Sequence, residues 1–116
     1  MHTLVAEDDG EVIGFANLGA AREDDVLGLG ELFAIYVHPD AWGRGAGQAL
    51  MAETLARLRA EGFGEAILWV LEDNPRTRRF YELAGWRADG TVKDEEWLGT
   101  RIREVRYRIR LDSDAS

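Results

Sequence analysis

The sequence predicts an α+β domain whose mixed sheet contains a central strand–helix–strand crossover. Apolar segments typical of strands alternate with two helical segments in the order β-β-β-α-β-α-β, with room for one more strand near the end. A tight Asp-Gly turn joins the first two strands, and a glycine-rich turn opens the first helix. Because the 116 residues contain neither a repeat nor a linker, we expect one domain over residues 1–116.

The first half of the pattern is a hairpin followed by a buried strand. Leu4–Ala6 and Val12–Leu18 are expected to pair across a turn at Asp9-Gly10. Leu32–Val37 is apolar and rich in β-branched and aromatic residues, which predicts a largely buried strand. That strand should stop before Pro39, because proline cannot donate to a sheet ladder.

Two helices and two further strands follow in the predicted order. The first helix is expected over Ala46–Glu61 and the next strand over Ala66–Leu71, which makes a parallel pair with a right-handed crossover. The second helix should start at Pro75 and run to Ala84. A turn is predicted at Asp89-Gly90, and a last strand over Glu104–Leu111, where apolar residues alternate with arginines.

Composition excludes several classes of function. The chain has no cysteine and only two histidines, so disulfides, thiolate metal sites and a cysteine nucleophile are excluded and no metal site is expected. No apolar run approaches the roughly 20 residues that span a bilayer and no signal-peptide pattern opens the chain, so we expect a cytoplasmic protein without a membrane partner.

Acidic residues dominate the first third of the chain. The net charge is −8, and residues 1–31 contain eight acids against a single arginine. Such a field repels nucleic acid and favours cationic partners. The alternative, that the acidity only keeps the protein soluble, remains open.

The most informative segment is the glycine-rich turn at residues 38–50. A turn of this kind at the start of a helix directs several backbone N–H groups toward one point, where a phosphate or diphosphate can bind. No G-K-[ST] follows, which excludes a Walker A loop, and the spacing of Gly43, Gly45 and Gly47 differs from G-x-G-x-x-G.

Two motifs in this order resemble those of the GNAT acyltransferases. Gly45 and Gly47 match the last two anchors of [QR]-x-x-G-x-[GA], whereas Trp42 stands where glutamine or arginine is usual. A second pattern, N-x-x-[AS]-x-x-F-Y-x-x-x-G-[FW], is matched in register except at Thr77, and its matching residues are Asn74, Phe80, Tyr81, Gly85 and Trp86. The resemblance covers residues 4–111.

The resemblance implies a GNAT-type, mostly antiparallel twisted sheet in which the two strands flanking the first helix splay apart. The pantetheine arm of acetyl-CoA would lie in that opening, and its diphosphate would sit on the amides of the glycine-rich turn. The implied cofactor-binding residues are Ile35, Tyr36, Val37, Trp42, Gly43, Arg44, Gly45, Ala46, Gly47, Gln48, Asn74 and Tyr81. We also expect positive charge near the phosphates from Arg44, Arg76, Arg78 and Arg79, although each is also explained as part of a solvated surface.

Two catalytic residues follow from the same resemblance. Glu31 lies eleven residues before Trp42, at the position of the general base in histone-type members, and would help remove the proton of the amine. Tyr81 resembles the general acid that protonates the departing thiolate, while the N–H near Val37 would stabilise the oxyanion. The alternatives are an exposed acid at a strand entrance for Glu31 and a packed helix tyrosine for Tyr81.

The implied function is transfer of an acetyl group from acetyl-CoA to a primary amine, on a small molecule or a peptide or protein terminus, by direct attack in a ternary complex. The alternative is a non-catalytic acyl-CoA-binding module or remnant. Typical members begin with a strand and two helices that are absent before the hairpin here, so we expect an N-terminally truncated form of the fold. The sheet edge left exposed would favour a homodimer.

Overall fold

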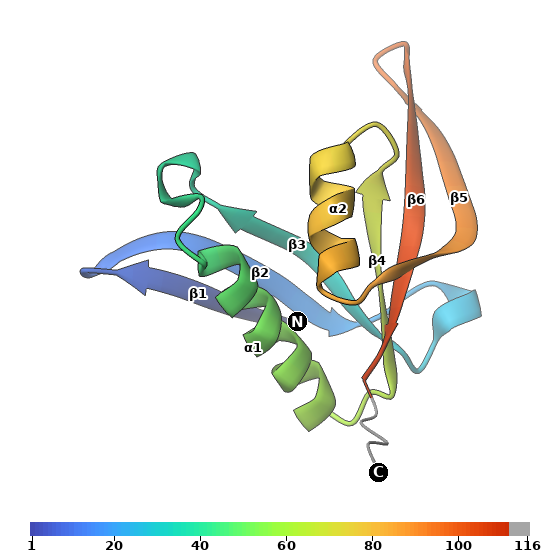
Figure 1. The fold of residues 1–116 in the computed structure, drawn as a ribbon. Coiled ribbons are helices and arrows are strands. Elements are labelled where there is room, and N and C mark those ends of the chain that lie inside the picture. Colours follow the sequence, from blue (N-terminus) through green and yellow to red (C-terminus); the bar gives the residue numbers. More distant parts are fainter. Residues whose placement is uncertain (112–116) are drawn as a thin grey trace.

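A computed structural model of the chain describes residues 1–111, which form a six-stranded sheet and two helices (Figure 1). Short 3-10 turns occur at Asp24–Val26 and Pro39–Ala41. The main elements are β1 (His2–Asp8), β2 (Glu11–Ala20), β3 (Gly30–Val37), α1 (Ala46–Ala60), β4 (Glu65–Leu71), α2 (Pro75–Leu83), β5 (Arg87–Trp97) and β6 (Thr100–Arg110). No helix in this described range is long and apolar enough to cross a membrane.

The sheet has the strand order β1-β2-β3-β4-β6-β5 and is mixed, because β3 and β4 are parallel while the other neighbours are antiparallel. Both helices lie on the same side of the sheet in Figure 1, with α1 across β1–β3 and α2 beside β4. We call this side the helix face and the opposite side the far face. The predicted α+β class with a β3-α1-β4 crossover is therefore confirmed.

The two parallel strands diverge soon after they start. Only Gly30 and Glu31 of β3 pair with β4, opposite Ala66 and Ile67. From residue 32 to residue 37 the β4-facing edge of β3 has no strand partner, and the gap between the two ribbons widens upward in Figure 1. The expected splay is confirmed, and Glu31 lies at its vertex.

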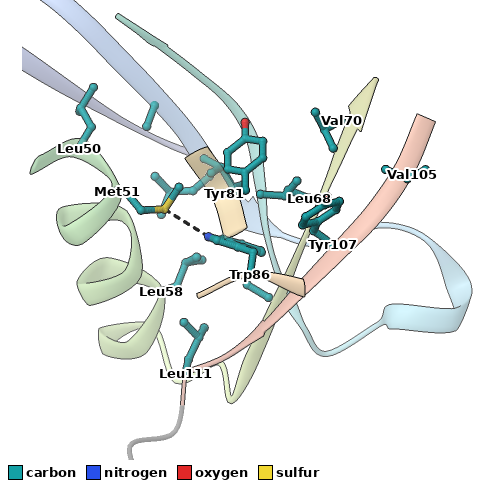
Figure 2. Packing of buried hydrophobic residues seen from close by; sticks show 14 residues of the cluster. Leu50, Met51, Leu58, Leu68, Val70, Tyr81, Trp86, Val105, Tyr107 and Leu111 are labelled. Atoms are coloured by element: carbon teal, nitrogen blue, oxygen red, sulfur yellow. Dashed lines mark hydrogen bonds between the residues drawn. The ribbon is translucent and has the colours of Figure 1, made fainter. Parts of the chain in front are cut away.

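The main core fills the helix face around Trp86 (Figure 2). Trp86 is fully buried, and its indole Nε1 donates a hydrogen bond to Met51 Sδ at 3.4 Å. The buried positions Leu50, Met51, Thr54 and Leu58 recur every three or four residues, so one side of α1 faces the sheet. Packing of this stripe fixes where the N-terminus of α1 points.

Glycine conformations explain one confirmed turn and one wrong prediction. Asp9 and Gly10 have φ of 52° and 83°, as the predicted tight hairpin requires. The predicted turn at Asp89-Gly90 is wrong, because these residues lie inside β5 at a register shift opposite β6. The Asp89 carboxylate there accepts a hydrogen bond from Thr91 N at 2.9 Å, so the Asp-Gly pair forms a bulge and the chain continues as a strand. The hairpin that joins β5 to β6 turns instead at Leu98-Gly99.

Candidate functional site

A cavity of about 420 Å³ opens on the helix face, between the free end of β3, the glycine-rich turn and the start of α2. It contains most of the residues that the sequence assigned to cofactor binding. Its lining residues are Ile35, Tyr36, Val37, Ala41, Trp42, Gly43, Gly45, Ala46, Gly47, Gln48, Arg76, Thr77 and Phe80. One compartment thus joins the two motifs, which are separated by a helix and a strand in the sequence.

The glycine-rich turn presents free backbone amides to this cavity. Gly43 and Gly45 have φ of 83° and 84°, a left-handed conformation that favours glycine. Gly45 is the N-cap of α1 and the first helical bond runs from Ala49 N to Gly45 O, so the N–H groups of residues 46–48 have no helical acceptor. A Cβ on Gly43 or Gly45 would meet no atom within 4 Å, so the space beside the turn is open to a ligand.

Gly47 has a different role from its neighbours. A Cβ at this position would lie 3.2 Å from the Phe80 ring of α2, closer than ordinary van der Waals contact. Gly47 is therefore needed for α1 and α2 to approach each other, which links the two motifs by packing.

Trp42 bridges the walls of the cavity. Its indole Nε1 donates a hydrogen bond to the Val37 carbonyl at 2.8 Å, which ties the turn to the end of β3. The Arg76 guanidinium of α2 stacks on the same ring, with Cζ 4.0 Å from the ring centroid. The Val37 carbonyl is therefore already bonded within the protein. The Trp42–Arg76 contact joins residues 34 positions apart, and no sequence pattern predicts it.

The four arginines proposed to attract phosphate lie in different surroundings. Arg76 lines the cavity and has no carboxylate partner among residues 1–111. Arg44 points to Asp8, 3.4 Å away. Arg78 donates to the Tyr107 hydroxyl at 3.0 Å and to the Glu72 carbonyl at 3.1 Å, while Arg79 is exposed. Arg76 is therefore the arginine that combines cavity lining with an unpaired guanidinium.

Three predicted cofactor residues, Arg44, Asn74 and Tyr81, do not line the cavity. Asn74 caps α2 by accepting a hydrogen bond from Thr77 N at 3.2 Å. Tyr36 contributes to the lining, but its ring lies beside that of Phe15, with the centroids 5.8 Å apart.

Tyr81 lies in the core next to the cavity. The residue is 7% exposed, and its ring packs edge-on against Phe80 and Trp86. The centroids of the Tyr81 and Tyr107 rings are 6.4 Å apart. Figure 2 shows its hydroxyl pointing away from Trp86. Burial raises the pKa of Tyr81 to about 12, so the phenol keeps its proton throughout the physiological range.

Glu31 is buried at the vertex of the splay. Its side chain faces away from the helices, because its neighbour Gly30 faces Leu58 and Phe63 of the main core. Only 9% of the residue is exposed, and its carboxylate forms no hydrogen bond or ion pair with residues 1–111. Burial and then the nearby Glu23 carboxylate raise the pKa of Glu31 above its ordinary value, against the opposing effects of Lys93, Arg22 and Arg106. The alternative in which Glu31 is an exposed acid at a strand entrance therefore does not fit its buried position.

Comparison with known proteins agrees with this arrangement. Residues 1–86 match the model of the Acetyltransferase (GNAT) family. The chain belongs to the GNAT family. It is 37% identical over 104 residues to the uncharacterized N-acetyltransferase YuaI of Bacillus subtilis, an alignment that covers 88% of this chain and 58% of that protein. The chain thus spans little more than half the length of this relative.

Solved structures share the GNAT fold. The ribosomal-protein-alanine N-acetyltransferase from Brucella melitensis superposes with a TM-score of 0.82 at 25% identity, covering 94% of this chain and 68% of that one. The yncA structure from Salmonella typhimurium, described with its cofactor acetyl-CoA, has a TM-score of 0.81 at 24% identity and covers 95% and 64% of the two chains.

Sequence reasoning missed a polar cluster on the far face of this GNAT domain. Trp69 of β4 donates from its indole to Glu23 at 2.8 Å, and Lys93 lies 4.3 Å from the ring centroid. The nearby Arg106 is almost fully buried, although arginine on an alternating strand predicts exposure. No group of three or more acidic or histidine side chains suited to a metal occurs within residues 1–111.

Proposed function

We propose that this chain is an acetyl-CoA-dependent N-acetyltransferase that transfers the acetyl group to a primary amine by direct attack in a ternary complex. The acceptor is a small molecule or the amino terminus of a peptide or protein. The observation that carries the proposal is the unpaired edge of β3, which runs from the vertex at Glu31 to a cavity with free amides at the helix N-terminus.

The cavity has groups suited to each part of acetyl-CoA. The amides of residues 46–48 suit the diphosphate, since N–H groups and the helix dipole converge there. Ile35, Val37 and Phe80 offer apolar contacts to the pantetheine arm. Because the Val37 carbonyl accepts a hydrogen bond from Trp42, we expect the arm to pair with the Val37 N–H and with Ile35. The Val37 N–H, which the resemblance assigned to the oxyanion, would thus hold the arm instead.

The acceptor would approach from the far face. Glu31 lies on that face, six residues before Val37, which corresponds to about 20 Å of extended strand. An extended arm that starts at the glycine-rich turn would run along most of β3 to bring its thioester near the vertex. There Glu31 would assist proton removal from the amine, while Tyr81 would donate to the departing sulfur from the helix face.

A transfer assay tests this proposal. The protein is incubated with acetyl-CoA and a panel of alkylamines, diamines, amino acids and peptides with free amino termini, and thiol release is followed. We expect release that depends on the amine. Binding of acetyl-CoA without release above background for any amine would favour the non-catalytic binding module instead.

Arg76 is expected to strengthen acetyl-CoA binding through a phosphate. Stacking on Trp42 leaves the N–H edge of the guanidinium free, and one lost charge-assisted hydrogen bond corresponds to about a tenfold change in Kd. Arg76→Gln should therefore raise the Kd for acetyl-CoA about tenfold in isothermal titration calorimetry. Arg79→Gln, an equal charge change on the same helix, is the control and should bind like the wild type; equal affinity of both variants would contradict this role.

We also propose that a homodimer forms through β1, which is an edge strand of the sheet. A monomeric mass in light scattering at assay concentration would contradict it.

A further inference from the structure

The loop between β2 and β3 packs against the far face of the sheet at Ile67. We call residues 21–29 the far-face loop. Its two ends are joined by a hydrogen bond from Ala21 N to the Leu29 carbonyl at 2.9 Å. Ala21, Val26 and Leu29 pack with Ile67 of β4, in a cluster separate from the main core. Ile67 is the ladder partner of Glu31, so the loop folds down at the vertex of the splay.

The buried guanidinium of Arg106 connects this loop to β5, at the edge of the sheet. Arg106 of β6 donates from Nη1 to Asp25 in the loop at 2.8 Å, and from Nε to Asp89 in the β5 bulge at 2.7 Å. Its Nη2 donates to the Thr91 hydroxyl at 3.0 Å. The Arg106 side chain is 5% exposed, whereas that of Asp25 is 60% exposed. The exposed Asp25 therefore pairs with a buried guanidinium that Asp89 and Thr91 of β5 also bind.

Glu31 lies next to the part of the chain that this ion pair restrains, since it follows Leu29 by only two residues. The charged groups that face it come from three elements: Glu23 and Arg22 from the far-face loop, Lys93 from β5 and Arg106 from β6. Glu23 is itself held by the Trp69 indole. The far-face loop and its flanking side chains are thus among the groups that surround the Glu31 carboxylate.

We propose that Asp25 and Arg106 are positioning residues whose ion pair holds the far-face loop beside Glu31 and limits the access of water to its carboxylate. The inference rests on the proposed function, in which Glu31 assists proton removal. Neither positioning residue touches the acceptor. They act through the loop. A carboxylate with little access to water is a stronger proton acceptor than the same carboxylate in solvent, so the loop would make Glu31 a better base.

Asp25→Asn tests the inference, with Asp24→Asn as a matched control. The two acids are adjacent and exposed, and the Asp24 carboxylate has no hydrogen bond or ion pair within residues 1–111. Breaking the ion pair should hydrate Glu31 and lower its pKa, so the acid limb of the pH profile of kcat/KM should move to lower pH. We expect kcat/KM at neutral pH to fall about tenfold in Asp25→Asn, with the Kd for acetyl-CoA unchanged. Asp24→Asn should match the wild type.

A second measurement does not depend on turnover. The Glu31 carboxyl carbon is titrated by NMR in the wild type and both variants, and its pKa should fall only in Asp25→Asn. Asp25→Glu keeps the charge and should restore part of the wild-type behaviour. Wild-type titration of Glu31 in Asp25→Asn, or an equal shift in both asparagine variants, would overturn the inference. Failure of the proposed function is distinguishable, because it would appear as wild-type protein that transfers no acetyl group.

Discussion

Replacing Glu31 with glutamine is expected to lower kcat/KM for amine acetylation by about 10²–10⁴-fold while making the protein more stable at neutral pH. The loss of activity follows from removing the proposed base. The gain in stability follows from burial, because Glu31 is desolvated and has no ion-pair partner within residues 1–111. Neutral glutamine has the same shape without that cost, and such changes at functional sites commonly add about 1 kcal/mol to the free energy of unfolding.

The stability gain expected for Glu31→Gln depends on pH. Since the folded pKa of Glu31 is raised above its ordinary value of 4.5, its contribution to stability is fully present below that value and is lost as pH rises through the folded pKa. The stability difference between Glu31→Gln and wild type, from thermal unfolding, should therefore be largest near neutral pH and shrink below pH 4.5. Glu11→Gln, at an exposed position, is the control. Wild-type activity in Glu31→Gln would contradict the assignment.

Tyr81→Phe should reduce kcat by about 10²-fold and leave the Kd for acetyl-CoA unchanged. The ring would keep its contacts with Phe80 and Trp86, and only the hydroxyl would be lost. Because the pKa of Tyr81 is about 12 and that of a thiol is near 8.5, complete proton transfer from Tyr81 to the thiolate is uphill by about 5 kcal/mol. We therefore expect the hydroxyl to act by donating a hydrogen bond to the departing sulfur.

Tyr107→Phe provides the control for Tyr81→Phe, because it makes the same chemical change on a neighbouring buried ring. The Tyr107 hydroxyl donates to Glu82 at 2.6 Å and accepts from Arg78, so its loss should lower the melting temperature. Its kcat should stay within about twofold of the wild type, given its existing partners. Steady-state kinetics and thermal unfolding of both variants test this prediction. A loss of kcat in Tyr107→Phe but not in Tyr81→Phe would contradict the assignment of Tyr81 as the donor to the sulfur.

Local signals were sufficient to predict most of the fold. The Asp9-Gly10 hairpin, the strand that ends before Pro39 and the helix after the glycine-rich turn each depend on residues close in sequence. The same reasoning placed a turn at Asp89-Gly90, because an Asp-Gly pair carries the same signal in a bulge as in a hairpin. The true turn contains Leu98, which gives no turn signal although its φ is 50°.

The site was less predictable where distant residues meet. Most of the expected cofactor residues lie between residues 35 and 48, and all of these except Arg44 line one cavity because they are close together in the chain. Whether Arg76 or Arg79 would face that cavity depends on the rotation of α2, which the sequence pattern did not resolve. The burial of Glu31 depends on the far-face loop and on Arg106, which follows Asp25 by 81 residues. No local pattern contains that contact.

Thermal unfolding of the wild-type chain in increasing concentrations of acetyl-CoA tests the central claim most directly, namely that the open edge of β3 and the amides of residues 46–48 form the cofactor site. A ligand that binds only the folded state at 100 times its Kd adds about 2.7 kcal/mol to the free energy of unfolding. We expect the melting temperature to rise continuously with acetyl-CoA and the rise to be smaller for Arg76→Gln at each concentration. A melting temperature that does not change up to the solubility limit of acetyl-CoA would contradict the claim.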